Sequence, residues 1–200
     1  RRIVAVGVSA VLYSGRDFLF EVTRPRHWAR TADGRSIVGV GGIGGRIEPG
    51  EGALACLRRE VREEIAADFW LEPSGTTALI RDGEMEGWLD GLGGTGRPVP
   101  YIINLLPPQI QRVEHPDHVA IVTFRGRVWG QPQVADLFGL LRVEYSALPA
   151  FFDREAWAVK EALAQPGVRF DLTEDLPSDA LLRPTLTGRA FQTLLRHGHV

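Results

Sequence analysis

The stretch that decides the fold is Gly44-Gly45-Arg46-Ile47-Glu48-Pro49-Gly50-Glu51, followed by Arg59-Glu60-Val61-Arg62-Glu63-Glu64. A glycine-rich loop leads into a predicted helix over about 52–66, which carries Glu60, Glu63 and Glu64 at spacings of three and four residues. These spacings place the carboxylates on one helix face, where they repel one another unless a cation lies among them. A hard divalent cation such as Mg²⁺ suits this set, because it prefers oxygen ligands and leaves positions open for phosphate.

A second face of the same helix is apolar. The residues Leu54, Leu57, Val61 and Ile65 recur at helical spacing and predict the face that packs on the core. Cys56 is the single cysteine, so no intrachain disulfide forms, and we predict that it is a small packing residue.

The stretch resembles the signature of the Nudix hydrolases, in particular the MutT-like members. That signature is Gly, five residues, Glu, seven residues, and then Arg-Glu-aliphatic-x-Glu-Glu-x-Gly-aliphatic. Here it begins at Gly45, passes through Glu51 and reaches Glu64, and seven of its nine positions match. The departures are Ala66, where the family has glycine, and Ala67, where it has a larger aliphatic residue. We expect them to alter the end of the helix and to leave the chemistry intact.

The resemblance implies roles for the acidic residues and their neighbours. Glu60, Glu63 and Glu64 resemble the family's ligands for Mg²⁺ or Mn²⁺, one of which also acts on the attacking water. Arg59 resembles the residue that orients a neighbouring carboxylate such as Glu60 through a charge-assisted hydrogen bond. The backbone carbonyl of Gly44 resembles the family's main-chain metal ligand.

Further site residues follow from the same resemblance. Gly45 shapes the loop, and Glu51 braces the loop against the helix. Family members often add an acidic residue from a later loop, as a metal ligand or a base. We expect Asp136 in this role, with Glu114 and Asp117 as alternatives.

The basic segment that includes Arg24, Arg26 and Trp28 has two interpretations. In one, the arginines bind phosphate and the indole stacks on a base. In the other, the segment is a surface turn with Trp28 packed on the core, and the sequence favours neither. For Trp88, which lies in a glycine-rich segment, we predict packing in preference to a cover for a substrate base.

The rest of the chain predicts alternating strands and helices. Strands are expected at 3–12, 18–23, 36–40, 101–106, 118–128 and 140–145, with the first two forming a hairpin. A glycine-rich, acidic insertion at about 82–100 is predicted to be a long loop. A turn is expected at 146–149. The C-terminal extension at about 153–200 is predicted to be helical, with Asp153 capping one helix to about Gln165 and Thr187 capping a last helix that ends near His197.

This order of elements predicts the α/β class. We expect one domain over residues 1–200, built as an α/β/α sandwich with a mixed β-sheet and a loop-helix-loop at the signature. The Nudix resemblance implies the same fold.

Composition narrows the classes of function. The chain has 200 residues, 44% hydrophobic and 24% charged, with a net charge of -2, which is typical of a globular protein and does not favour nucleic acid or membrane partners. No apolar run is long enough to span a bilayer and no signal peptide is recognisable, so we expect a cytoplasmic location.

The combined pattern predicts an Mg²⁺- or Mn²⁺-dependent hydrolase of a diphosphate bond in a nucleoside diphosphate linked to another group. The alternative is a non-catalytic Nudix-like module that binds a nucleotide or regulates a partner, and a third possibility is an unrelated acidic surface helix. The intact acidic set favours the enzyme. The expected partner is a small-molecule nucleoside diphosphate derivative, family habit suggests a homodimer, and no marker identifies the substrate.

Overall fold

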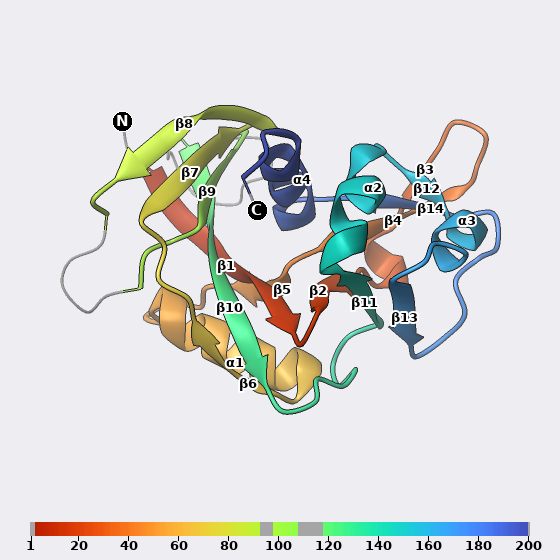
Figure 1. The fold of residues 1–200 in the computed structure, drawn as a ribbon, viewed down its shortest axis with the longest axis horizontal. Coiled ribbons are helices and arrows are strands. Elements are labelled where there is room, and N and C mark those ends of the chain that lie inside the picture. The colour runs from red at the N-terminus through yellow and green to blue at the C-terminus, as the bar shows by residue number, and fades with distance from the viewer. Residues whose placement is uncertain (1–2, 93–97, 108–117, 200) are drawn as a thin grey trace.

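The computed structural model describes residues 3–92, 98–107 and 118–199 (Figure 1). Its strands are β1 Ile3–Ser14, β2 Asp17–Val22, β3 Ala29–Arg30, β4 Ser36–Gly41, β5 Ile43–Arg46, β6 Asp68–Leu71, β7 Thr76–Arg81, β8 Glu84–Asp90, β9 Ile102–Leu106, β10 His118–Trp129, β11 Gly139–Glu144, β12 Trp157–Ala158, β13 Val168–Leu172 and β14 Leu181–Pro184. The α-helices are α1 Ala53–Ile65, α2 Leu148–Asp153, α3 Val159–Leu163 and α4 Thr187–Arg196. Short 3-10 turns cover Pro25–His27 and Tyr145–Ala147.

The described strands form one mixed sheet, which agrees with the predicted α/β class. Its main path runs β12-β14-β4-β2-β1-β10-β9-β7-β8. The pairs β1–β10, β4–β14 and β7–β9 are parallel, and the other pairs are antiparallel. Helix α1 lies against one side of the central strands, and α4 lies on the other (Figure 1).

The central strand β1 has buried side chains on both faces, which explains its continuous apolar sequence. Val8, Ala10 and Leu12 pack in the core beneath α1, whereas Val11 belongs to the core on the opposite face. The predicted hairpin forms with β2, and the strands expected at 36–40, 101–106, 118–128 and 140–145 are confirmed with shifts of one residue at their ends.

Helix α1 follows the predicted pattern. Leu57, Val61 and Ile65 have no exposed surface, and Cys56 is fully buried as a packing residue. The helix ends at Ile65, because Ala66 adopts the left-handed conformation with φ of 50°. The family glycine falls at this position, and glycine adopts this conformation at lower cost.

The prediction of a long loop at about 82–100 is wrong over much of its length, because residues 84–90 form strand β8. Strand β8 pairs with β7 through a tight turn at Asp82 and Gly83, both of which have positive φ angles. An Asp-Gly pair between two strands is a strong hairpin signal, and it outweighs the glycine-rich, acidic composition that predicted a loop here. Strands β6 and β7 were also not predicted. Residues 93–97 of the insertion lie outside the described residues.

The prediction that residues 153–200 form a helical extension is also wrong in part. Helix α2 ends at Asp153, so this residue caps no following helix, and the turn expected at 146–149 is largely helical. Strands β12, β13 and β14 occupy much of the region, with β14 parallel to β4 and β13 antiparallel to β11. Only the last helix, α4, agrees closely with the prediction. Pairing with distant strands outweighs the local helical pattern here.

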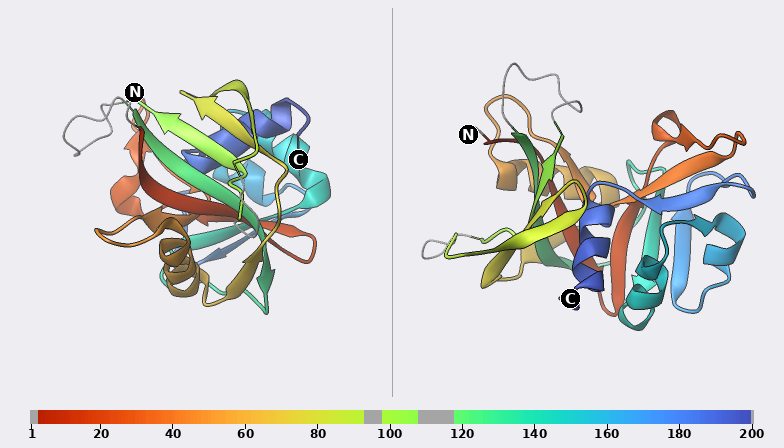
Figure 2. Two further views of the ribbon diagram at one scale, coloured as in Figure 1. Left: turned by 90° about the vertical axis from the view of Figure 1, so that its left-hand side faces the viewer. Right: turned by 90° about the horizontal axis from the view of Figure 1, so that it is seen from above.

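Helix α4 is attached to the centre of the sheet through its first turn (Figure 2). Thr187 is the first helical residue, and its side chain caps nothing, contrary to the prediction. Instead its Oγ1 is hydrogen-bonded at 2.7 Å to Ser9 Oγ, which lies 2.9 Å from Thr123 Oγ1. A Cβ on Gly42 would fall 2.6 Å from Thr187 Cγ2, so the helix rests directly on the segment between β4 and β5.

Membrane insertion through a helix has no support in the described residues, where every helix is too short or too polar to cross a bilayer.

We predict that Ala66→Gly stabilises the protein by about 1 kcal/mol, because glycine removes the cost of the left-handed conformation at the end of α1. Urea unfolding of the two proteins measures the difference. Ala55→Gly is the matched control, since this exposed residue lies within α1 and its substitution destabilises the helix. Destabilisation by both substitutions would contradict the prediction.

Candidate active site

Two glycines allow the loop to approach the acidic face of α1. Gly44 has φ of 145°, and a Cβ there would lie 2.3 Å from the carbonyl oxygen of Val8 on the paired strand β1. A Cβ on Gly45 would lie 2.4 Å from the Glu60 carboxylate. A side chain at residue 44 would therefore push the loop away from β1, and one at residue 45 would displace the Glu60 carboxylate, which is the physical reason for the glycine pair.

Arg59 joins the loop to the helix. Its Nε and Nη2 donate to the two carboxylate oxygens of Glu51, each at 3.1 Å. Its Nη1 donates to Glu60 Oε1 at 2.7 Å and to Glu63 Oε2 at 3.2 Å. The hydrogen bonds from Arg59 hold the pKa of Glu51 at about 2, well below its usual range. One guanidinium thus fixes three carboxylates relative to one another.

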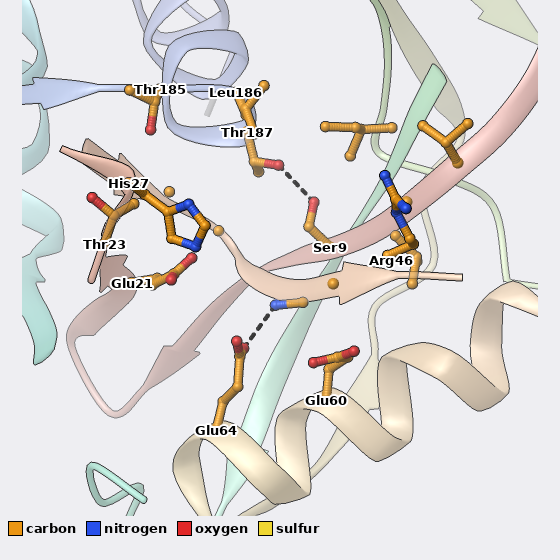
Figure 3. A pocket seen from close by; sticks show the side chains of 18 of the residues that line it. Ser9, Glu21, Thr23, His27, Arg46, Glu60, Glu64, Thr185, Leu186 and Thr187 are labelled. Atoms are coloured by element: carbon orange, nitrogen blue, oxygen red, sulfur yellow. Dashed lines mark hydrogen bonds between the residues drawn. The ribbon is translucent and has the colours of Figure 1, made fainter. Parts of the chain in front are cut away.

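Glu64 lies deeper in the site. Its Oε2 accepts a hydrogen bond of 3.0 Å from the backbone N–H of Gly44 (Figure 3). Burial raises the pKa of Glu64 to about 9, and the negative charge of Glu21 adds to this effect. A carboxyl group with so high a pKa lies where negative charge is not neutralised by the protein.

Glu21 is a member of the site that the sequence analysis missed. It comes from β2, far from the signature, and it lines the same cavity as Glu60 and Glu64. Burial raises its pKa to about 7, the charge of Glu60 also raises it, and the charge of Arg24 lowers it. In the sequence, Glu21 is notable only as the one acidic residue inside the apolar run from Phe18 to Val22. This pattern does not show which part of the fold lies opposite the Glu21 side chain.

The segment after β10 brings Asp136 to the site. The backbone N–H groups of Gln133, Ala135 and Asp136 donate to the last carbonyls of α1, at distances of 2.9 to 3.0 Å. These bonds satisfy helix carbonyls that would otherwise lack partners. Asp136 Oδ1 then pairs with Arg24 Nη2 at 2.6 Å. The alternatives Glu114 and Asp117 lie outside the described residues.

The carboxylates border a cavity of about 780 Å³. Its basic lining residues include Arg24, Arg26 and Arg46, and the Nε of Arg26 donates to His27 Nε2 at 3.0 Å. Figure 3 shows His27 and Arg46 on opposite sides of the site. The cavity is large enough for a small-molecule ligand, and its arginines are suited to anionic groups.

The two tryptophans considered for base stacking lie away from this cavity. Trp28 packs edge-on against Phe138 at 5.5 Å between ring centroids, and its Nε1 donates to the carbonyl oxygen of Thr23 at 2.7 Å. Trp88 lies edge-on to His199, with ring centroids 4.7 Å apart. Neither indole is among the residues that line the cavity. Of the two interpretations of Trp28, the structure therefore favours packing.

Within the part of the chain that the structure describes, no three His, Cys, Asp or Glu side chains stand close enough together to hold a metal ion. The reason is visible in the contacts, because Arg59 holds Glu60 and Glu63 while the Gly44 amide holds Glu64. The chemistry of the set nevertheless fits a hard cation, since five carboxylates line one cavity and burial disfavours the charge on two of them.

Comparisons with known proteins agree with this arrangement. Residues 4–90 match the family model of the NUDIX domain, a range that includes the whole signature. This part of the chain therefore matches the Nudix family, in agreement with the resemblance that the signature carries. A search of curated proteins gives no match.

Among solved structures, the similar ones include the Escherichia coli ORF135 protein, at 15% identity over 74% of this chain and 79% of that one, with a TM-score of 0.40. A MutT protein from Methanosarcina mazei Go1 has 15% identity over 68% and 72% of the two chains, with a TM-score of 0.37. A MutT NUDIX hydrolase from Burkholderia pseudomallei has 15% identity over 68% and 74%, with a TM-score of 0.33. Likenesses this distant transfer no activity to the chain.

We predict that Gly45→Ala leaves the fold intact but weakens Mn²⁺ binding by roughly tenfold or more, because the new Cβ displaces the flexible Glu60 carboxylate. Titration of Mn²⁺ measures the effect, and urea unfolding checks the fold. Gly75→Ala is the control, since a Cβ there meets no atom within 4 Å. Equal Mn²⁺ affinity in both variants would contradict the prediction.

We also predict that Glu64→Gln stabilises the metal-free protein by about 1–3 kcal/mol near neutral pH. The folded-state pKa of about 9 lies above the ordinary value of 4.5, so ionisation destabilises the fold as pH rises through this interval. The advantage of the variant should therefore grow from about pH 5 to about pH 8. Urea unfolding in chelator measures it, and an advantage that shrank with rising pH would refute the argument.

Proposed function

We propose that the protein hydrolyses a diphosphate bond in a nucleoside diphosphate linked to another group, in a reaction that depends on Mg²⁺ or Mn²⁺. The observation that carries the proposal is the cavity that Glu60, Glu63 and Glu64 line together with Gly44 and Gly45, where burial disfavours the charged form of Glu64. An acidic cavity repels an anionic substrate unless a cation lies between them.

The expected metal ligands are the carboxylates of Glu60, Glu63 and Glu64 and the backbone carbonyl of Gly44, with Asp136 as a further ligand from the loop. Hard oxygen donors of this kind suit Mg²⁺ and Mn²⁺. When bound, such a cation neutralises the diphosphate and lowers the pKa of a coordinated water.

The protein's own residues supply position and proton transfer. Arg59 holds Glu60 by the 2.7 Å hydrogen bond and, through Glu51, keeps the loop against the helix. A carboxylate of the acidic set accepts a proton from the attacking water. Arg24, Arg26 and Arg46 line the cavity and are suited to hold phosphate oxygens on either side of the bond that breaks.

The alternative is a Nudix-like module that binds a nucleotide without cleaving it. The same cavity and arginines would serve both functions. The two functions therefore differ in whether they need the acidic residues of α1. All three glutamates of the signature helix are present, and each is held by a specific contact or lines the cavity. This arrangement favours catalysis, because a binding module has no use for a buried repulsive cluster.

The experiment is a panel of nucleoside diphosphate derivatives and nucleoside triphosphates, assayed for phosphate and nucleotide release with Mg²⁺, with Mn²⁺ and with chelator. We expect turnover of at least one compound with metal and none with chelator. The double variant Glu63→Gln with Glu64→Gln should lower the rate by at least about 100-fold, because it removes the carboxylates that act on metal and water.

Glu174→Gln is the matched control, because this exposed carboxyl lies outside the cavity lining. Binding of a panel compound without turnover, in the presence of metal, would favour the non-catalytic module. Turnover that persisted in chelator and in the double variant would contradict the proposed mechanism.

A further inference from the structure

Glu21 occupies a position that the Nudix signature does not explain. It lies on β2, where it pairs with Gly41 of β4 on one side and with Leu140 of β11 on the other. Its neighbours Phe20 and Val22 are fully buried in the core. Alternation along the strand therefore turns the Glu21 side chain away from that core and toward the cavity.

The opposing residue leaves room for the carboxylate. A Cβ on Gly41 would lie 3.6 Å from Glu21 Oε2, so the carboxylate rests beside the bare backbone of β4. That backbone continues directly into the segment that carries Gly44. Figure 3 shows Glu21 of β2 and Glu64 of α1 at the edge of the same pocket.

Glu21 differs from the other acids of the site in its lack of a partner. Glu60 receives a hydrogen bond from Arg59, Glu64 receives one from the Gly44 amide, and Asp136 pairs with Arg24. Among the described residues, no hydrogen bond or ion pair engages the Glu21 carboxylate.

This isolation affects the charge of Glu21. The Glu21 side chain is half-buried, and burial of a carboxylate that has no donor or cation beside it disfavours its charged form. The cation whose charge acts on it, Arg24, directs its guanidinium to Asp136. A carboxylate without a partner, in a cavity shared with Glu60 and Glu64, is suited to bind a cation from outside the chain.

We propose that Glu21 binds the divalent cation of the site directly, as a ligand contributed by β2 opposite the carboxylates of α1. This inference rests on the proposed function, because it assigns a further residue to the same metal. A ligand from β2 would place the cation between the sheet and the helix, next to the Gly41–Gly44 backbone. The signature helix alone would then be an incomplete metal site.

The first test compares Mn²⁺ binding by the wild-type protein and by Glu21→Gln, with free Mn²⁺ measured by electron paramagnetic resonance in the absence of any substrate. We expect roughly tenfold or greater weakening. Glu64→Gln is the positive comparison, and Glu174→Gln is the control carboxylate. Urea unfolding in chelator verifies that each variant folds.

The second test distinguishes a ligand from a nearby charge. Glu21→Cys replaces a hard oxygen donor by a thiolate, which prefers a soft ion such as Cd²⁺. If residue 21 binds the metal directly, the variant gains a sulfur-to-cadmium charge-transfer absorption that the wild-type protein, with its buried Cys56, does not show. A residue that acts only through its charge would give no such band.

The outcomes separate this inference from the proposed function. Weak Mn²⁺ binding in Glu64→Gln but wild-type binding in Glu21→Gln, with no new band for Glu21→Cys, would overturn the role of Glu21 and leave the proposed function in place. Failure of the wild-type protein to bind Mn²⁺ would overturn both. Weakened binding together with the cadmium band would establish Glu21 as a ligand.

Discussion

The site depends on one close approach, that of the Gly44–Gly45 backbone to the acidic face of α1. The Gly44 amide donates to Glu64, and the bare Cα of Gly45 leaves room for the Glu60 carboxylate. Arg59 then binds Glu51 and Glu60 together, so loop and helix form one unit. Without two small residues here, the carboxylates would lie farther from the strand backbone, and the repulsion among them would favour outward rotamers. Geometry thus holds the acidic groups of the site close together and close to the strand backbone.

The region beyond the family match supports this unit from the other face of the sheet. Residues 4–90 match the family model, but α4 comes from the far end of the chain. Its first turn rests on Gly42, and Thr187 is linked through Ser9 to Thr123 of β10. The backbone from Gly42 to Gly45 is therefore held between α4, at Gly42, and α1, at Gly44 and Gly45. A close approach of this kind needs support on both sides, because an unsupported loop would move away from the repelling carboxylates.

Prediction from the sequence succeeded where the information was local. The helix α1, its apolar face and the strands β1, β2, β4, β9, β10 and β11 follow from periodicity within one segment. It failed at β8 and in the C-terminal region, where pairing partners decide the structure. Strand β8 is polar and contains Gly87, so its sequence alone indicates a loop, and its strand form comes from pairing with β7. Strand β14 has only the four residues Leu181–Pro184, and its strand form comes from parallel pairing with β4.

The sequence by itself determined the acidic helix, the glycine pair and the resemblance to the Nudix signature. Helical spacing places positions three and four apart on one shared face without help from the rest of the chain. Only the tertiary structure decided that Glu21 joins that face, that Asp136 pairs with Arg24 beside it, and that Trp28 packs on Phe138 instead of lining the cavity. The physical reason is that these contacts join residues far apart in the chain, whose distances depend on strand order and register, and neither is encoded by the local spacing of residues.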